Sequence, residues 1–189
     1  AMRSFEAQGL IRRRQGIGTF VVSQPQVIES GLEVLESIET LSRRIQLDVS
    51  MGELDISSIH ADAYQAEALG GEVGSTLIRV SRVIIADNRP VAYLVDILPD
   101  DILTPEELRN GFNGSVLDFL IRRGSPPPAT SLTEIRAAAA STDISRALQI
   151  QRGDVLLNFE ARLYTLEGRN IDLSYSYFLP GYFRFQVVR

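Results

Sequence analysis

The sequence of 189 residues contains no cysteine and only one histidine, His60. Without cysteine the chain can form neither a disulfide nor a thiolate metal site, and one histidine is too few for an imidazole-based metal site. No apolar run approaches the roughly 20 residues that a helix needs to cross a bilayer, and no secretory signal is present. We therefore expect a cytoplasmic protein that holds no metal and no cofactor.

The charge is distributed unevenly along the chain. The formal net charge is −5, yet residues 1–22 contain four arginines and one glutamate, a net of +3. The remainder contains fifteen arginines and twenty-three acidic residues, a net of −8. A small basic segment on an acidic body indicates an anionic partner that touches one end of the chain only.

Two amphipathic stretches of one design, residues 76–99 and 155–180, organise the rest of the chain. Each reads as a strand, a tight turn and a strand, with the turns at Asp87-Asn88 and Glu167-Gly168. Each also follows a short helical segment that ends in Ala-Leu. A shift of eighty residues places Arg82 over Arg162. Such a repeat predicts two hairpins in a single sheet with pseudo-twofold character, and a cleft between the halves is a natural ligand site.

The first 22 residues predict a helix followed by a basic hairpin. The helix ends at Gly9, a strand begins at Leu10, residues 12–17 form the turn and residues 18–22 return. A helix with a glycine-tipped basic hairpin is what the second half of a winged helix needs for contact with DNA. The residues expected to contact DNA are Arg12, Arg13, Arg14, Gln15, Gly16 and Gly18.

The stretch RSFEAQGLIRRRQGIGTFVV closely resembles the end of a GntR-type winged-helix DNA-binding domain. That family has a similar Gly-Leu-Ile step and a Gly-x-Gly-Thr-Phe-Val wing. Phe5 stands where leucine is usual, and Gln8 stands where an acid is usual. The first helices of the family would lie upstream of Ala1, so we expect a fragment that does not read a DNA sequence by itself.

The segment after the hairpin predicts a linker and then a bridging helix. Ser23-Gln24-Pro25 breaks the strand, and leucines and isoleucines recur every three or four residues from about Ser30 to Arg44. Caps predict further helix starts at Asp62, Thr104 and Ser115. The other expected elements are strands near 47–58, 130–140 and 182–188, and helices near 62–69 and 143–148.

Residues from about 45 to 189 resemble the UTRA domain, the effector-binding domain of GntR regulators of the HutC subfamily, which is related in fold to chorismate lyase. The resemblance implies an α+β fold with a mainly antiparallel sheet and helices, preceded by the C-terminal part of a winged helix-turn-helix. It implies domain boundaries of 1–24 for the winged-helix remnant, 25–45 for the linker and 46–189 for the effector domain. It also implies a DNA-binding transcriptional regulator, usually a homodimeric repressor, whose operator affinity changes when a small metabolite binds.

The ligand contacts of the UTRA family transfer only in part. Arg82 matches the first arginine of an Arg-x-Arg pair, but Ile84 stands in the second place. Leu94 and Leu117 replace a common glutamate and a common tyrosine. The resemblance therefore implies an apolar, weakly cationic pocket for a small organic acid with an apolar portion, rather than for a sugar phosphate. The expected ligand-binding residues are Arg82, Leu94, Ser115, Leu117, Glu134, Asp172, Tyr177 and Phe178.

The role of Arg82 has two interpretations. Arg82 lies on an otherwise apolar strand, and burying a charge without a partner is costly. It could pair with Asp172 or face water. Alternatively, the two residues lie at opposite ends of one cleft, and a ligand carboxylate meets Arg82 and the helix that begins at Ser115. Ser115 could also serve only as a helix cap.

The sequence contains no nucleophile–base pair and no glycine loop that would cradle a phosphate, so we expect a protein that is not an enzyme. A chorismate-lyase-like enzyme is one alternative, and the basic wing argues against it because such an enzyme has no use for one. A dimerisation module without a ligand is the other alternative, and it predicts a filled cleft.

Overall fold

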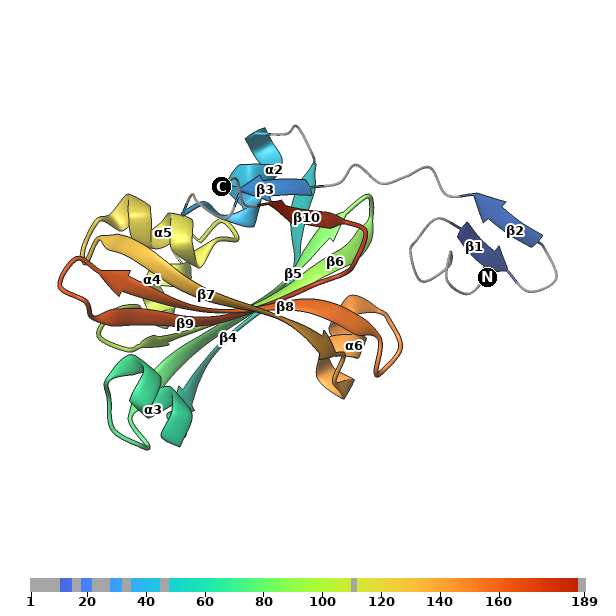
Figure 1. Ribbon diagram of the computed structural model, residues 1–189. Coiled ribbons are helices and arrows are strands. Elements are labelled where there is room, and N and C mark those ends of the chain that lie inside the picture. Colours follow the sequence, from blue (N-terminus) through green and yellow to red (C-terminus); the bar gives the residue numbers. More distant parts are fainter. Residues whose placement is uncertain are drawn as a thin grey trace.

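The computed structural model describes residues 11–14, 18–21, 28–31, 35–44, 48–109 and 112–186. Six strands form one antiparallel sheet, in which two hairpins stand back to back with β6 and β9 adjacent at the centre (Figure 1). The expected α+β fold with a mainly antiparallel sheet is confirmed. In sheet order the strands are β4 (Val49–His60), β5 (Thr76–Ala86), β6 (Arg89–Pro99), β9 (Asn170–Phe178), β8 (Val155–Thr165) and β7 (Pro128–Ala139).

Both predicted hairpins are present, and their turns follow from the turn residues. Asp87 and Asn88 join β5 to β6 with φ values of 50° and 57°. Two consecutive left-handed residues form the turn that matches the twist of paired strands, and Asp and Asn tolerate that conformation. Gly168, with a φ of 81°, serves the turn between β8 and β9.

The two hairpins correspond with an offset that differs by one residue from the predicted eighty. Leu77 packs in the cluster with α3 (Ala63–Leu69), and Leu156 packs in the cluster with α6 (Thr142–Leu148). These equivalent leucines are 79 positions apart. A slip of one residue moves a strand side chain to the other face of the sheet. Arg82 and Arg162 therefore face opposite sides, and the predicted match between them was wrong.

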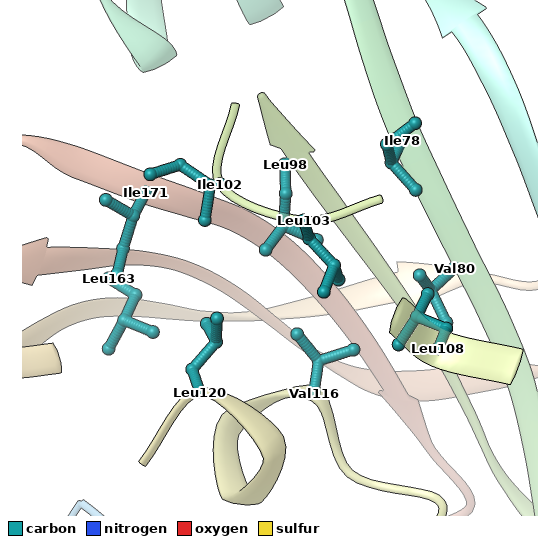
Figure 2. Close-up of a cluster of buried hydrophobic side chains, with 10 residues drawn as sticks. All are labelled: Ile78, Val80, Leu98, Ile102, Leu103, Leu108, Val116, Leu120, Leu163 and Ile171. Carbon is teal, nitrogen blue, oxygen red and sulfur yellow. The ribbon is translucent and has the colours of Figure 1, made fainter. Parts of the chain in front are cut away.

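Helices lie on both faces of the sheet. α3 and α6 lie on one face, and α4 (Pro105–Arg109) and α5 (Val116–Arg123) lie on the other (Figure 1). Ten buried aliphatic side chains join α4, α5 and the loop before them to the sheet (Figure 2). Full burial of each side chain contributes about 1.5–3 kcal/mol, so this cluster fixes the start of α5 against the strands. Its members are Ile78, Val80, Leu98, Ile102, Leu103, Leu108, Val116, Leu120, Leu163 and Ile171.

The helix starts on these two faces follow the predicted caps. Ser115 precedes α5, and its hydroxyl accepts a hydrogen bond from the Asp118 amide at 3.0 Å. Asp62 and Gln65 form a reciprocal capping box at the start of α3. Each cap satisfies backbone amides that have no partner within the helix.

The segment before β4 differs from the prediction. α2 spans Ile38–Arg44, shorter than the helix expected from about Ser30. Ile28–Gly31 instead forms strand β3, parallel to β10 (Phe183–Gln186), and Gly31 is unfavourable within a helix. None of the helices within the described ranges is long and apolar enough to cross a membrane.

The basic hairpin at the start of the chain is present as two antiparallel strands. β1 (Ile11–Arg14) pairs with β2 (Gly18–Val21), so Arg12, Arg13 and Arg14 lie in a strand, although the sequence predicted a turn there. The predicted helix over residues 1–9 lies outside the described residues, as do Gln15 and Gly16.

Candidate functional site

A cavity of about 400 Å³ lies between one face of the sheet and the segment 35–39 that leads into α2. Strands β5, β6, β8 and β9 form one wall, and the start of α5 and part of β7 form others. Six of the eight predicted ligand-binding residues line this one cavity, although they come from four different elements. These six residues are Arg82, Leu94, Ser115, Leu117, Asp172 and Phe178.

Glu134 and Tyr177, the other two predicted residues, do not line the cavity. Alternate side chains of a strand face opposite sides, and Thr133, Ser176 and Phe178 are the neighbours that reach the cavity. Glu134 forms an ion pair with Arg136 on the opposite face. Tyr177 packs in the cluster with α6 and stacks on Tyr93 with ring centroids 6.4 Å apart.

Arg82 is buried in the cavity wall, with 4% of its surface exposed, and its charge is already paired. Its Nη1 donates a hydrogen bond to Asp96 Oδ2, and its Nε lies 3.6 Å from Glu39 Oε1. The ring of Phe112 covers the guanidinium at 5.9 Å. Burial opposes the charge of Arg82, but Asp96 and Glu39 raise its pKa overall. One of the two interpretations of the sequence paired Arg82 with Asp172, whereas the structure pairs it with Asp96.

Asp172 is the most enclosed carboxyl group of the cavity. Burial raises its pKa well above the ordinary value of an aspartate, and the charge of Asp96 and a hydrogen bond with Asp96 raise it further. Arg82 acts in the opposite direction with a smaller effect. The Oδ1 atom of Asp172 is buried and has no hydrogen-bond partner in the described part of the chain. A buried acceptor without a donor is costly, so this atom is a candidate for contact with a ligand.

Glu39 brings a third carboxyl group to Arg82 from α2. Burial raises the pKa of Glu39, and the Arg82 charge only partly offsets this effect. Its Oε1 is buried without a hydrogen-bond partner among the described residues. Glu39 therefore approaches Arg82 as a charge at 3.6 Å without the hydrogen bond that a strong pair would have.

A hydrogen-bond network ties α2 to α5 at the edge of the cavity. The hydroxyls of Ser37 and Thr40 donate to Asp118 Oδ2 at 2.7 and 2.9 Å. The Asp118 amide in turn donates to the Ser115 hydroxyl. Ser115 thus acts as the cap of its own helix, and its lining position places this network within reach of a bound molecule.

Asp96 and Glu39, the two acids beside Arg82, were not predicted from the sequence. Asp96 carries the same signal that singled out Arg82, a charge between the apolar residues Val95 and Ile97 of one strand. Glu39 has no such signal, because many acids occur on amphipathic helices and only the tertiary fold brings this one to the sheet. Ser174 and Ser176, which add hydroxyls to the cavity, are equally ordinary in the sequence.

A second hollow of about 570 Å³ lies at the end of α3, beside the turn between β8 and β9. Two of its charged residues, Arg169 and Asp101, pair with each other at 2.8 Å, so neither of these two charges depends on a ligand. Within the described ranges, no group of acidic and histidine side chains is arranged to hold a metal ion. The smaller cavity, with its unpaired buried oxygens, is the stronger candidate site.

Comparison with known proteins matches residues 46–184 to the sequence model of the UTRA domain. The HTH-type transcriptional repressor NagR of Bacillus subtilis is 27% identical over 168 residues, which cover 89% of this chain and 68% of that protein. The HTH-type transcriptional regulator Rv0792c of Mycobacterium tuberculosis is 26% identical over 192 aligned positions, which cover 99% of this chain and 69% of that protein.

A solved structure shares the architecture over the whole chain. The crystal structure of PhnF from Mycobacterium smegmatis has a TM-score of 0.77 and 21% identity, and the likeness covers 100% of this chain and 81% of that one. At this identity the likeness establishes the fold, and the positions of individual ligand contacts are a separate question.

Proposed function

Because the chain belongs to the UTRA domain family and is a transcriptional regulator rather than an enzyme, we propose that its cavity binds the effector of a GntR-type repressor of the HutC subfamily. Residues 46–189 form the effector domain in this proposal, residues 1–24 belong to the DNA-binding domain, and residues 25–45 join the two. The observation that carries the proposal is the cavity of about 400 Å³, whose wall includes residues 35–39 of this joining segment. The alternative of a dimerisation module predicted a filled cleft.

Transmission of the signal requires that the effector binds two states of the protein with different affinity. Glu39 and Ser37 line the cavity and belong to the segment that joins the effector domain to the DNA-binding domain in this proposal. A molecule that contacts Glu39 or disturbs the bonds to Asp118 changes the position of α2 relative to α5. Coupling free energies of roughly 1–3 kcal/mol are usual for such linkage and would change operator affinity by about 5- to 150-fold.

The basic hairpin supplies the non-specific part of DNA binding in this proposal. Arg12, Arg13 and Arg14 lie on β1 and would contact phosphates or the minor groove. Neutralising all three in the full-length protein should weaken operator binding and flatten its salt dependence by roughly one unit of slope per lost contact. An unchanged salt slope would remove these residues from the interface.

We place the protein in the cytoplasm as a homodimer. A twofold-symmetric dimer matches the symmetry of an operator with two half-sites, which is the usual arrangement for helix-turn-helix proteins. Sedimentation of the full-length protein with and without operator DNA tests this assignment, and a monomer on the operator would contradict it.

The chemical class proposed from the sequence for the effector is a small organic acid with an apolar portion. Leu94, Phe159 and Phe178 supply apolar walls for such a molecule. Arg82, the expected partner of its carboxylate, is paired with Asp96 and approached by Glu39. An acid would therefore reach Arg82 only by displacing Glu39, which makes the charge of the effector a separate question.

A substitution that fills the cavity tests the proposed function. Ala161 lines the cavity on β8, so Ala161→Phe should fill it without touching the basic hairpin. A thermal-shift screen of small carboxylates, amines, sugars and phosphorylated compounds first identifies the effector. We expect the full-length variant to bind operator DNA normally and to lose its response to this effector. Retention of the full effector response in the blocked variant would contradict the proposal.

A further inference from the structure

We propose that the effector of this cavity carries a positively charged nitrogen, which binds between Asp172 and Glu39. This inference rests on the proposed function, because it assigns a ligand class to the same cavity. The sequence predicted an organic acid as the ligand. The structure favours a different class because Arg82, the expected partner of that acid, already contacts Asp96 and Glu39.

The charges that line the cavity are strongly unbalanced. Arg82 is the only basic residue among the described lining residues. Four acids line the same cavity, and Arg82 already donates to one of them, Asp96. A ligand carboxylate would add one more negative charge to a poorly solvated site, whereas an ammonium group would offset the surplus. The four acids are Glu36, Glu39, Asp96 and Asp172, of which Glu36 has a further partner and is not counted in the surplus.

The cavity has two buried oxygen atoms and one buried donor, Arg82 Nε, without a hydrogen-bond partner among the described residues, and Arg82 Nε lies 3.6 Å from Glu39 Oε1. Asp172 Oδ1 and Glu39 Oε1 are each buried without a hydrogen-bond partner in the described part of the molecule. They come from different elements, β9 and α2. An ammonium group has three donors and no acceptor, so it can satisfy such atoms without adding an unpaired acceptor of its own. A carboxylate, which has acceptors only, can satisfy neither.

The remaining lining suits the rest of such a molecule. Ser174 and Ser176 offer hydroxyls beside Asp172 on the same strand. Leu94, Phe159 and Phe178 form an apolar wall. The site therefore fits an amine with an apolar body, with or without hydroxyl groups.

The direction of proton exchange on binding should distinguish an amine from an acid. Asp172 interacts with Asp96 on β6 and Arg82 on β5, and Glu39 on α2 lines the same cavity, while Asp118 on α5 accepts a hydrogen bond from Ser37 before α2. Burial and the charge of Asp96 raise the pKa of Asp172. A cation beside Asp172 favours its ionised form, so binding of an amine should release a proton. Binding of an acid should instead take up a proton.

A matched series of probes tests the charge directly. The probes 3-phenylpropylamine, 3-phenylpropanol and 3-phenylpropionate share one apolar body and differ in their head groups. Calorimetry with the full-length protein near pH 7, in buffers of different ionisation enthalpy, measures affinity and proton exchange together. We expect the amine to bind at least about tenfold more tightly than the other two and to release a proton, as a charge-assisted contact implies.

Two variants locate the effect within the cavity. Asp172→Asn should lower the affinity for the amine by about tenfold and abolish the proton release. The control Asp143→Asn changes an exposed carboxylate on α6, which lies 3.7 Å from Arg146, and should change neither quantity. Thermal unfolding of Asp172→Asn, which we expect to show an unchanged or higher Tm, verifies that the variant folds.

The outcomes separate the charge of the ligand from the identity of the site. Tightest binding of 3-phenylpropionate with proton uptake, equal binding of the three probes, or binding of none would overturn the inference and leave the effector cavity in place. Ala161→Phe should abolish binding of the amine. Amine binding that persists in Ala161→Phe would place the probe outside the cavity and overturn the inference, whereas the proposed function is tested separately by the effector response of this variant.

Discussion

Arg82 and Arg162 stand on the first strands of two hairpins of one design, yet their surroundings are opposite. Arg82 faces the cavity, is 4% exposed and pairs with Asp96. Arg162 lies on the other face, partly exposed, and donates to the hydroxyl of Tyr64 at 3.1 Å. One residue of register separates the two environments, because alternate strand side chains face opposite sides. The role of an arginine in this fold therefore depends on the face it occupies.

The two faces also differ in how their charges are balanced. Around Arg162, Arg136 forms ion pairs with Glu134 and with Glu160, the latter at 3.3 Å. Arg136 and Glu134 are exposed, where an ion pair contributes little, and only Glu160 of this group is largely buried. Among the described residues that line the cavity, four acids accompany one arginine, and two of these acids, Asp96 and Asp172, are buried. On the face of Arg162 the charged side chains are paired with one another, whereas the cavity face retains buried oxygen atoms without hydrogen-bond partners that a ligand can contact.

Replacing Arg82 should give the largest effect and test this comparison most severely. Arg82→Ala leaves Asp96 and Glu39 buried without their cation, and breaking a buried pair in this way costs roughly 3–5 kcal/mol. Urea denaturation near neutral pH measures the loss of unfolding free energy. A loss below about 1 kcal/mol would show that water reaches the cluster and that Arg82 is effectively at the surface.

Asp172→Asn should have the opposite sign and a smaller size. Burial raises the pKa of Asp172 in the folded protein, so the folded state holds this proton more tightly than the unfolded state does. This contribution to stability is greatest below the unfolded pKa and is lost as the pH rises through the folded pKa. The variant should therefore be more stable near pH 8, by roughly 1–2 kcal/mol, and its stability should fall less between pH 5 and 8. Parallel pH profiles of the two proteins would contradict this assignment.

The sequence predicted the turns and helix caps on both faces of the sheet, but not which side chains meet on each face. Asp87-Asn88, Asp62 and Ser115 predicted their turn and caps because those signals act within a few residues. Arg82 was identified as a charge on an apolar strand, and the same reasoning applied to Asp96 would have found its partner. The pairing of Arg82 with Glu39 depends on tertiary packing. The sheet face that Glu134 and Tyr177 occupy depends on strand register, and an error of one residue in the register reverses that face.

The caps of α5 and α6 allow the same comparison between helices on opposite faces. Ser115 accepts from the Asp118 amide at 3.0 Å, and Ser141 accepts from the Ile144 amide at 3.3 Å. Ser115→Ala should cost about 1 kcal/mol, and Ser141→Ala should cost less, because its bond is longer and the residue is exposed. Thermal unfolding of the two variants measures the difference. Equal losses would show that the cavity face does not strengthen the cap.

Arg162→Ala should give the smallest effect, within about 0.5 kcal/mol of the unaltered protein. Its contacts include the hydroxyl of Tyr64 and the ring of the same residue, 5.8 Å from the guanidinium, and the hydroxyl of Tyr164. Tyr64 also donates to Glu160, and Glu160 keeps Arg136 at 3.3 Å, so the substitution leaves Glu160 with both of these partners. The affinity for a cavity ligand should not change, because Arg162 points away from the cavity. Urea denaturation in parallel with Arg82→Ala gives the contrast directly, and a double-mutant cycle with Tyr64→Phe isolates the one hydrogen bond. A loss comparable to that of Arg82→Ala would mean that Arg162 is buried in the working protein, for instance by a second copy of the chain on this face of the sheet.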